Sequence, residues 1–143
     1  MTMSVGNAEV LRAREVLLAG AAEGEVLRLG RPLSFWGGVD PNSGEVTDPR
    51  HPQFGECMAG CIVAMERGIG SSSGSSILLE LLANGKGPVG LLLIEPDAIL
   101  TLAAVVAREM GYADLPIFLI TEPDFARLPE RLRMHATGVL EAV

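Results

Sequence analysis

Aromatic residues are scarce in this 143-residue chain, at 4% of the sequence against 48% for all hydrophobic residues. The core is therefore expected to be aliphatic, and the length suits one domain with a substantial core. Basic residues are also in deficit, with 11 Lys and Arg against 18 Asp and Glu. The resulting net charge of −7 makes nucleic acid and anionic membranes poor partners.

Long hydrophobic runs are missing as well. Gly, Pro or a charged residue interrupts every apolar segment before it reaches the length of a membrane span. The N-terminus lacks the basic and then apolar pattern of a signal peptide. We therefore expect no membrane contact and a cytoplasmic location.

Cysteine and histidine are each present only twice. Two ligands cannot complete a closed zinc or iron–sulfur site, so we expect this chain to bind no metal and Cys57 and Cys61 to be reduced, partly buried thiols. His51 lies between two prolines and has no visible partner in the sequence. We interpret it as a solvated surface residue, with catalysis as the less favoured alternative.

Glycine and serine are concentrated in residues 68–76 (GIGSSSGSS). The apolar run 60–65 before this stretch predicts a buried strand, and the spacing of apolar residues in 77–84, with a stop at Gly85, predicts a helix. Unpaired N–H groups and partial positive charge at a helix N-terminus attract anions. The alternative is a plain connector, because Gly and Ser turn and cap well. Three consecutive serines favour a ligand site, although neither a P-loop nor a G-x-G-x-x-G pattern is present.

The rest of the chain predicts a β-rich part followed by a β-α-β-α-β part with a parallel sheet, that is, an α/β domain. Residues 1–24 are expected to form a partly helical N-terminal extension, with a helix over 7–18, and residues 25–143 the domain. The later elements are expected in this order: a strand at 89–94, a helix at 98–110 capped by Asp97, a strand at 115–120, a loop or short helix at 123–131 and a final strand within 135–143.

Three phrases carry a resemblance: residues 33–41 (LSFWGGVDP), residues 48–52 (DPRHP) and residues 68–75. In this order and spacing they resemble the small, swivel subunit of aconitase X, a group of divergent dehydratases of the aconitase superfamily. The resemblance covers roughly residues 25–122. It implies a swivelling β/β/α domain like the mobile fourth domain of aconitase.

The resemblance also implies a function. A larger subunit would carry an iron–sulfur cluster and most substrate contacts, and the active site would form where the subunits meet. Ser71 would be the base that takes the substrate proton, with Gly70, Ser72 and Ser73 as substrate-binding neighbours. The substrate would be small and anionic or zwitterionic. Bacterial members resemble cis-3-hydroxy-L-proline dehydratases, which Trp36 favours here, and archaeal members resemble mevalonate-5-phosphate dehydratases.

One position departs from the family pattern. The family usually has Arg between the first two loop glycines, whereas this chain has Ile69. Arg67 lies two residues earlier in the sequence and is the candidate to take the place of this arginine. The departure keeps two other hypotheses open: a non-catalytic swivel module that binds a partner or an anion, and a separate anion-binding domain. Phe35 and Trp36 are expected to shape a wall of the core or of the subunit interface.

Overall fold

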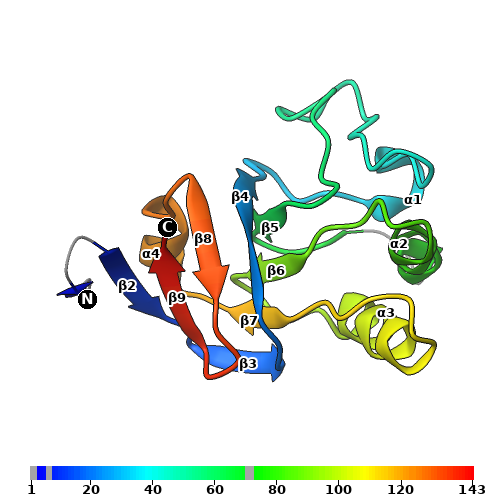
Figure 1. The fold of residues 1–143 in the computed structure, drawn as a ribbon. Helices are drawn as coiled ribbons and strands as arrows, with labels where there is room; N and C mark the ends of the chain where they lie inside the picture. The colour runs from blue at the N-terminus through cyan, green and yellow to red at the C-terminus, as the bar shows by residue number, and fades with distance from the viewer. Residues whose placement is uncertain (1–2, 6–7, 70–72) are drawn as a thin grey trace.

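The computed structural model describes residues 3–5, 8–69 and 73–143 of the chain (Figure 1). These residues contain nine strands and four helices, joined by loops. The strands are β1 (Met3–Val5), β2 (Ala8–Arg12), β3 (Glu15–Leu18), β4 (Ala22–Arg28), β5 (Ile62–Met65), β6 (Gly90–Leu93), β7 (Ile117–Leu119), β8 (Arg131–Met134) and β9 (Val139–Ala142). The helices are α1 (Phe35–Gly38), α2 (Ser73–Ala83), α3 (Ala98–Glu109) and α4 (Glu122–Ala126). The strands are hydrogen-bonded in the order β1-β2-β9-β8-β4-β5-β6-β7-β3.

Strands β4, β5, β6 and β7 form a parallel group in the middle of this order. Helix α2 connects β5 to β6 and helix α3 connects β6 to β7, and the two helices pack against each other. This confirms the predicted β-α-β-α-β order, with each element within a few residues of its expected position. Asp97 caps α3, as predicted, by accepting hydrogen bonds from the backbone N–H groups of Ile99 and Leu100.

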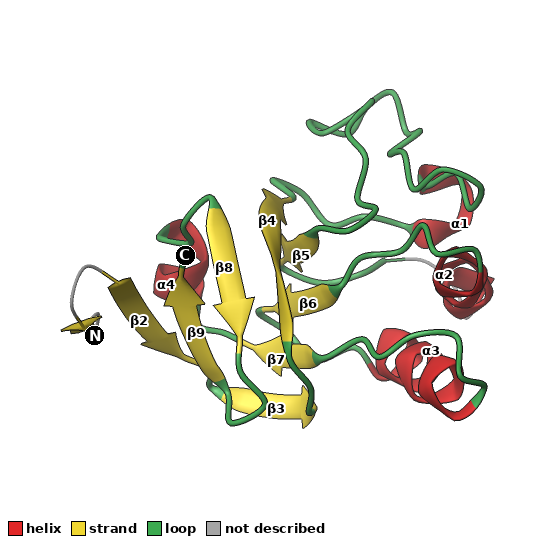
Figure 2. Cartoon of the chain, viewed as in Figure 1, coloured by secondary structure: helices red, strands yellow, loops and turns green. Residues whose placement is uncertain are grey.

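Side chains of β5 and β6 alternate between two separate hydrophobic clusters, because successive strand residues point to opposite faces. Val63 and Leu91 pack in the cluster that includes α2 and α3. Ile62 and Leu92 pack in the cluster that includes β2, β8 and β9. Figure 2 shows α1, α2 and α3 on one side of the parallel strands, and the antiparallel strands β2, β8 and β9 together with α4 on the other. The layering is therefore β/β/α, which confirms the fold class that the resemblance implies.

The predicted helix over residues 7–18 is wrong, and the first 24 residues are not partly helical in the described part. β2 pairs with β9, and β3 pairs with β7 at the opposite edge of the sheet. Leu11 is buried in the core, and the chain between the two strands is held by backbone hydrogen bonds from Ala13 to Gly138 and from Arg14 to Leu119. Two sheet edges offer these residues backbone partners, and such tertiary contacts override a weak helical pattern.

Two further differences concern the end of the chain and the start of β4. β8 begins at Arg131, the last residue of the segment expected to be a loop or short helix, while α4 and β9 lie where a short helix and a final strand are predicted. β4 begins at Ala22 and so crosses the expected boundary between residues 24 and 25. None of the described helices is both long and apolar enough to cross a membrane.

Candidate functional site

The candidate site lies where the parallel strands β5 and β6 end at their carboxyl termini. In open parallel sheets, ligands bind at this edge, close to the N-termini of the helices that follow. The segment after β5 leads through Gly68 and Ile69 to α2, and the segment after β6 leads through Asp97 to α3. The Gly/Ser stretch therefore connects a strand to a helix, as predicted.

Of the four residues predicted to form the site, only Ser73 is described. It is the first residue of α2 and is half-buried. Gly70, Ser71 and Ser72 lie outside the described residues. The assignment of Ser71 as the base, and of its neighbours as substrate-binding residues, stays a prediction.

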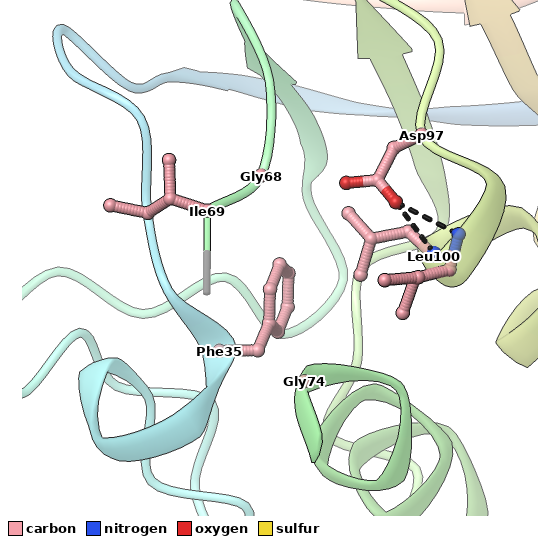
Figure 3. A pocket seen from close by; sticks show the side chains of 7 residues that line it. Phe35, Gly68, Ile69, Gly74, Asp97 and Leu100 are labelled. Atoms are coloured by element: carbon pink, nitrogen blue, oxygen red, sulfur yellow. Dashed lines mark hydrogen bonds between the residues drawn. The ribbon is translucent and has the colours of Figure 1, made fainter. Parts of the chain in front are cut away.

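A small hollow of about 30 Å³ lies between the N-termini of α2 and α3 (Figure 3). One oxygen of Asp97, Oδ1, accepts hydrogen bonds of 3.0 Å from the N–H groups of Ile99 and Leu100. The other, Oδ2, faces Gly68, where an added Cβ would lie 2.7 Å from it. A side chain at position 68 would therefore displace the carboxylate of Asp97 that caps α3. The hollow is too small for a substrate.

The aromatic phrase packs directly against the Gly/Ser stretch. Leu33 forms a parallel bridge with Gly68, and the Leu33 carbonyl accepts a 3.1 Å hydrogen bond from the N–H of Ile69. Phe35 is buried, with its Cβ 3.7 Å from where a Cβ on Gly74 would lie. Phe35 therefore forms the core wall that the sequence predicts.

Trp36 is not part of the core, because 62% of its surface is exposed. The chain turns at Gly37, whose φ of 77° lies in the left-handed region that glycine favours. This turn interrupts the helical geometry of α1 and leaves the indole on the surface. The role of Trp36 in an interface wall stays a prediction.

Two larger hollows lie next to Ile69, which is itself 45% exposed. The first, about 200 Å³, is lined by Arg31, Pro32, Asp48, Arg50, His51 and Ile69. The second, about 420 Å³, is lined by Ser34, Trp36, Gly37, Gly38, Asp48, Pro49, Arg50 and Ile69. The three sequence phrases that carry the family resemblance thus meet around one side chain.

His51 is buried, so the interpretation of it as a solvated surface residue is wrong. Its Nδ1 accepts a 3.0 Å hydrogen bond from the N–H of Gln53, and its Nε2 lies 3.0 Å from the carbonyl oxygen of Arg31. This pairing fits the neutral ring with its hydrogen on Nε2. Gln53 in turn accepts a 2.9 Å hydrogen bond from the N–H of Gly30 through its side-chain oxygen. His51 therefore joins the loop around residue 50 to the segment around residue 31.

The charged groups near Ile69 differ from those expected. Arg67, the candidate substitute by sequence, has its Nε 3.4 Å from a carboxylate oxygen of Glu95. Arg31, Asp48 and Arg50 line the hollow instead. Sequence reasoning assigned no role to them or to the second oxygen of Asp97. Two sequence features could have pointed to these residues. Asp97 follows a buried strand, and Arg50 lies inside the second phrase.

The described residues do not fit an iron–sulfur cluster. Cys57 is exposed with its Sγ 3.2 Å from the carbonyl oxygen of Ser43, and the half-buried Cys61 has its Sγ 3.7 Å from the carbonyl oxygen of Cys57. Burial, and then the nearby Glu25, raise the pKa of the Cys61 thiol, which opposes the thiolate form that binds metals. Within the described ranges no group of three or more His, Cys, Asp or Glu side chains is placed to hold a metal ion.

Comparisons with known proteins agree with this geometry. The aconitase X swivel domain family matches residues 10–138. The cis-3-hydroxy-L-proline dehydratase of Pseudomonas aeruginosa is 46% identical over 83% of this chain, which spans only 22% of that protein. The phosphomevalonate dehydratase small subunit of Pyrococcus furiosus is 37% identical, with 85% of each chain covered. The crystal structure of Thermococcus kodakaraensis aconitase X in its holo form has a TM-score of 0.80 and 33% identity, covering 94% of this chain and 98% of that one. The chain therefore belongs to the aconitase X swivel domain family.

Proposed function

We propose that this chain is the swivel subunit of a heteromeric hydro-lyase that dehydrates a small hydroxy acid, with cis-3-hydroxy-L-proline as the favoured substrate. The observation that carries the proposal is the 46% identity to the Pseudomonas dehydratase, together with the meeting of the three family phrases around Ile69. The chain spans about a fifth of the length of that relative. In the proposed enzyme, a larger partner subunit carries the rest of the active site.

Ser71 is the proposed base. It precedes the first residue of α2 by two positions in the sequence. The N-terminus of a helix has unpaired N–H groups and partial positive charge, which stabilise a serine alkoxide or an anionic substrate. Gly70, Ser72 and Ser73 are the proposed substrate-binding neighbours. The proton that Ser71 removes is the one that makes elimination of the substrate hydroxyl possible.

The iron–sulfur cluster of the proposed enzyme belongs to the larger subunit. The described residues of this chain offer no ligand set for it, as the hydrogen bonds and the raised pKa of Cys61 indicate. The partner would therefore supply the cluster and most substrate contacts, and this chain would supply the wall around Ile69. A cytoplasmic location is part of the same proposal.

A second candidate is the small subunit of a phosphomevalonate dehydratase. One observation favours it: the relatives of that name are separate small chains of similar length, and 85% of the Pyrococcus furiosus subunit is covered. A non-catalytic swivel module is the third candidate, favoured by Ile69 at the position where the family usually has Arg.

Co-expression with an aconitase X large subunit tests the proposal. We expect a brown, iron-containing complex that dehydrates cis-3-hydroxy-L-proline. Dehydration of mevalonate-5-phosphate alone would establish the second candidate. A colourless complex without either activity would establish the third.

A further inference from the structure

We propose that His51 is a positioning residue that holds the start of the Gly/Ser stretch in place through residues 29–33. The consequence of this role for catalysis rests on the proposed function. Among the residues that the structure describes, His51 is the one buried side chain that is polar or charged, with 6% of its surface exposed. Burying a polar group is costly unless it is hydrogen-bonded, so the partners of the ring indicate what it does.

Both ring nitrogens of His51 have a partner, and the partners fix where the hydrogen is. Nδ1 lies 3.0 Å from the backbone nitrogen of Gln53, which can only donate, so Nδ1 is the acceptor. Nε2 therefore carries the hydrogen and donates it to the carbonyl oxygen of Arg31, 3.0 Å away. A ring with both nitrogens paired in this way offers no free atom to a substrate. His51 is thus suited to holding other groups in position rather than to reacting itself.

The segment of residues 29–33 connects His51 to the Gly/Ser stretch. His51 holds this segment at the carbonyl oxygen of Arg31. Two residues further on, the carbonyl oxygen of the buried Leu33 accepts a 3.1 Å hydrogen bond from the N–H of Ile69. Figure 3 shows Ile69 beside this segment, just before the chain enters Phe35. A displacement at Arg31 would therefore reach the second residue of the Gly/Ser stretch through two hydrogen bonds and two peptide units.

The loop that carries His51 is itself anchored in the core. The N–H of Gly55 donates a 2.9 Å hydrogen bond to the carbonyl oxygen of Val46, which is fully buried. The side-chain oxygen of Gln53 adds a second link from this loop, because it accepts a 2.9 Å hydrogen bond from the N–H of Gly30. The segment before Leu33 is thus held at two adjacent residues by a loop that is fixed at its base.

The position of Ile69 matters for the proposed reaction. His51 and Ile69 line the same hollow of about 200 Å³, and the proposed base, Ser71, follows Ile69 by two positions in the sequence. A misplacement of a catalytic group by about 1 Å can cost on the order of a hundredfold in rate. Loosening the contact between His51 and Arg31 should therefore lower turnover of the assembled enzyme without unfolding the chain.

The test compares two substitutions that each keep one of the two hydrogen bonds of the ring. In His51→Gln, the longer amide can place its NH₂ group near the position of Nε2 and so keep the bond to Arg31. In His51→Asn, the shorter amide can place its oxygen near the position of Nδ1 and keep the bond to Gln53, but it does not reach Arg31. The two variants therefore differ in the link on which the proposal depends.

Amide hydrogen exchange of the full chain, followed by NMR, measures the link directly. In His51→Asn, exchange at the Ile69 amide should be faster by about tenfold, the scale of a hydrogen bond whose buried acceptor loses its donor. In His51→Gln it should stay near the wild-type rate. The amide of Leu91 in β6, which donates to the carbonyl of Pro116, should be unchanged in both variants, because the effect is local. Turnover of cis-3-hydroxy-L-proline by the assembled complex should follow the order of the Ile69 exchange rates.

His135→Asn is the matched control. It is the same substitution at the second histidine of the chain, whose Nε2 lies 3.1 Å from a carboxylate oxygen of Glu141 in β9. It should leave exchange at Ile69 and turnover unchanged. Where His51→Asn does not fold, Gln53→Ala takes its place, because it removes the neighbouring bond to the segment.

Four results decide the matter. Wild-type exchange at Ile69 in His51→Asn overturns the proposal, and so does an equal acceleration at Leu91, which would indicate a general loss of stability. Wild-type turnover in His51→Asn despite faster exchange at Ile69 also overturns it, since the reaction would not depend on this position. Faster exchange confined to the region of Ile69, in a chain whose wild-type complex dehydrates nothing, supports the link and contradicts the proposed function.

Discussion

The parallel strands and the loops at their carboxyl ends differ in how far their side chains are buried. Every residue of β5, β6 and β7 is buried, and the clusters on both faces are built from apolar side chains. At the carboxyl edge of the sheet, by contrast, Ile69 and Trp36 are exposed, and Arg50 is held only by a 3.7 Å surface ion pair with Asp48. The difference indicates a rigid scaffold that holds an open surface. Substitutions in the first region should change stability, and those in the second should change activity or assembly.

The largest effect is expected in the scaffold. Phe118 lies in β7 and is fully buried in the cluster that the parallel strands share with β2, β8 and β9. Phe118→Ala should lower the free energy of unfolding by about 3–5 kcal/mol, because it removes a large side chain and leaves a cavity. Chemical denaturation measures this. Phe54→Ala is the matched control, since Phe54 is more than half exposed, and it should cost well under half as much. Similar losses for both would erase the distinction between scaffold and edge.

The next effect is expected at the edge, in catalysis. Ser71→Ala should lower turnover of the assembled complex by at least about a hundredfold, the lower scale for a positioned base. Stability should fall by no more than about 1 kcal/mol, the cost of a lost helix cap. Initial rates and thermal melts of the same samples separate the two quantities.

Ser76→Ala is the control for that experiment, because Ser76 is exposed within α2. It should leave turnover near the wild-type value. Near-normal turnover of Ser71→Ala would refute the assignment of the base. A large loss at Ser72 or Ser73 instead would move the base within the loop.

Assembly should show a smaller effect at Trp36. Replacing a buried tryptophan by alanine would cost about 3 kcal/mol or more. Since the indole is exposed, we expect a change in unfolding free energy within about 0.5 kcal/mol. Affinity for the large subunit should fall by about tenfold, as for a tryptophan anchor at an interface. Tyr112→Ala, which also removes an exposed aromatic ring, should leave assembly unchanged. Unaltered assembly in Trp36→Ala would place the interface elsewhere.

The smallest effect concerns Glu23 on β4. Hydrogen bonding and charge attraction from Arg133 hold the pKa of the Glu23 carboxyl below its ordinary value. A carboxyl group with a lowered pKa in the folded state stabilises the protein above the unfolded-state pKa, and this contribution is lost as the pH falls through the folded-state pKa. Glu23→Gln should therefore be slightly less stable than the wild type at neutral pH, with the difference vanishing in acid. A difference that is constant from pH 3 to pH 7 would contradict this assignment.

Much of the fold was predictable because its signals are local. Continuous apolar runs predicted β5, β6 and β7, and helical spacing with Asp97 and a terminal glycine predicted α3. The final strand and the short helix near residue 123 also lie where they were expected. Residues 8–18 were mispredicted because their conformation depends on partners far away in the sequence, such as Leu140 and Phe118. The family match also extends further, to residues 10–138, than the expected 25–122.

The sequence by itself determined the layered α/β fold, the strand-to-helix turn at the Gly/Ser stretch and the membership of the aconitase X swivel domain family. It did so because periodicity, capping residues and three short phrases are all encoded locally. Only the tertiary structure decided that His51 is buried, that Trp36 is exposed and that Arg50 rather than Arg67 lines the hollows beside Ile69. The physical reason is that burial and charge pairing depend on contacts between segments that are distant in the sequence. A local sequence pattern does not predict these contacts.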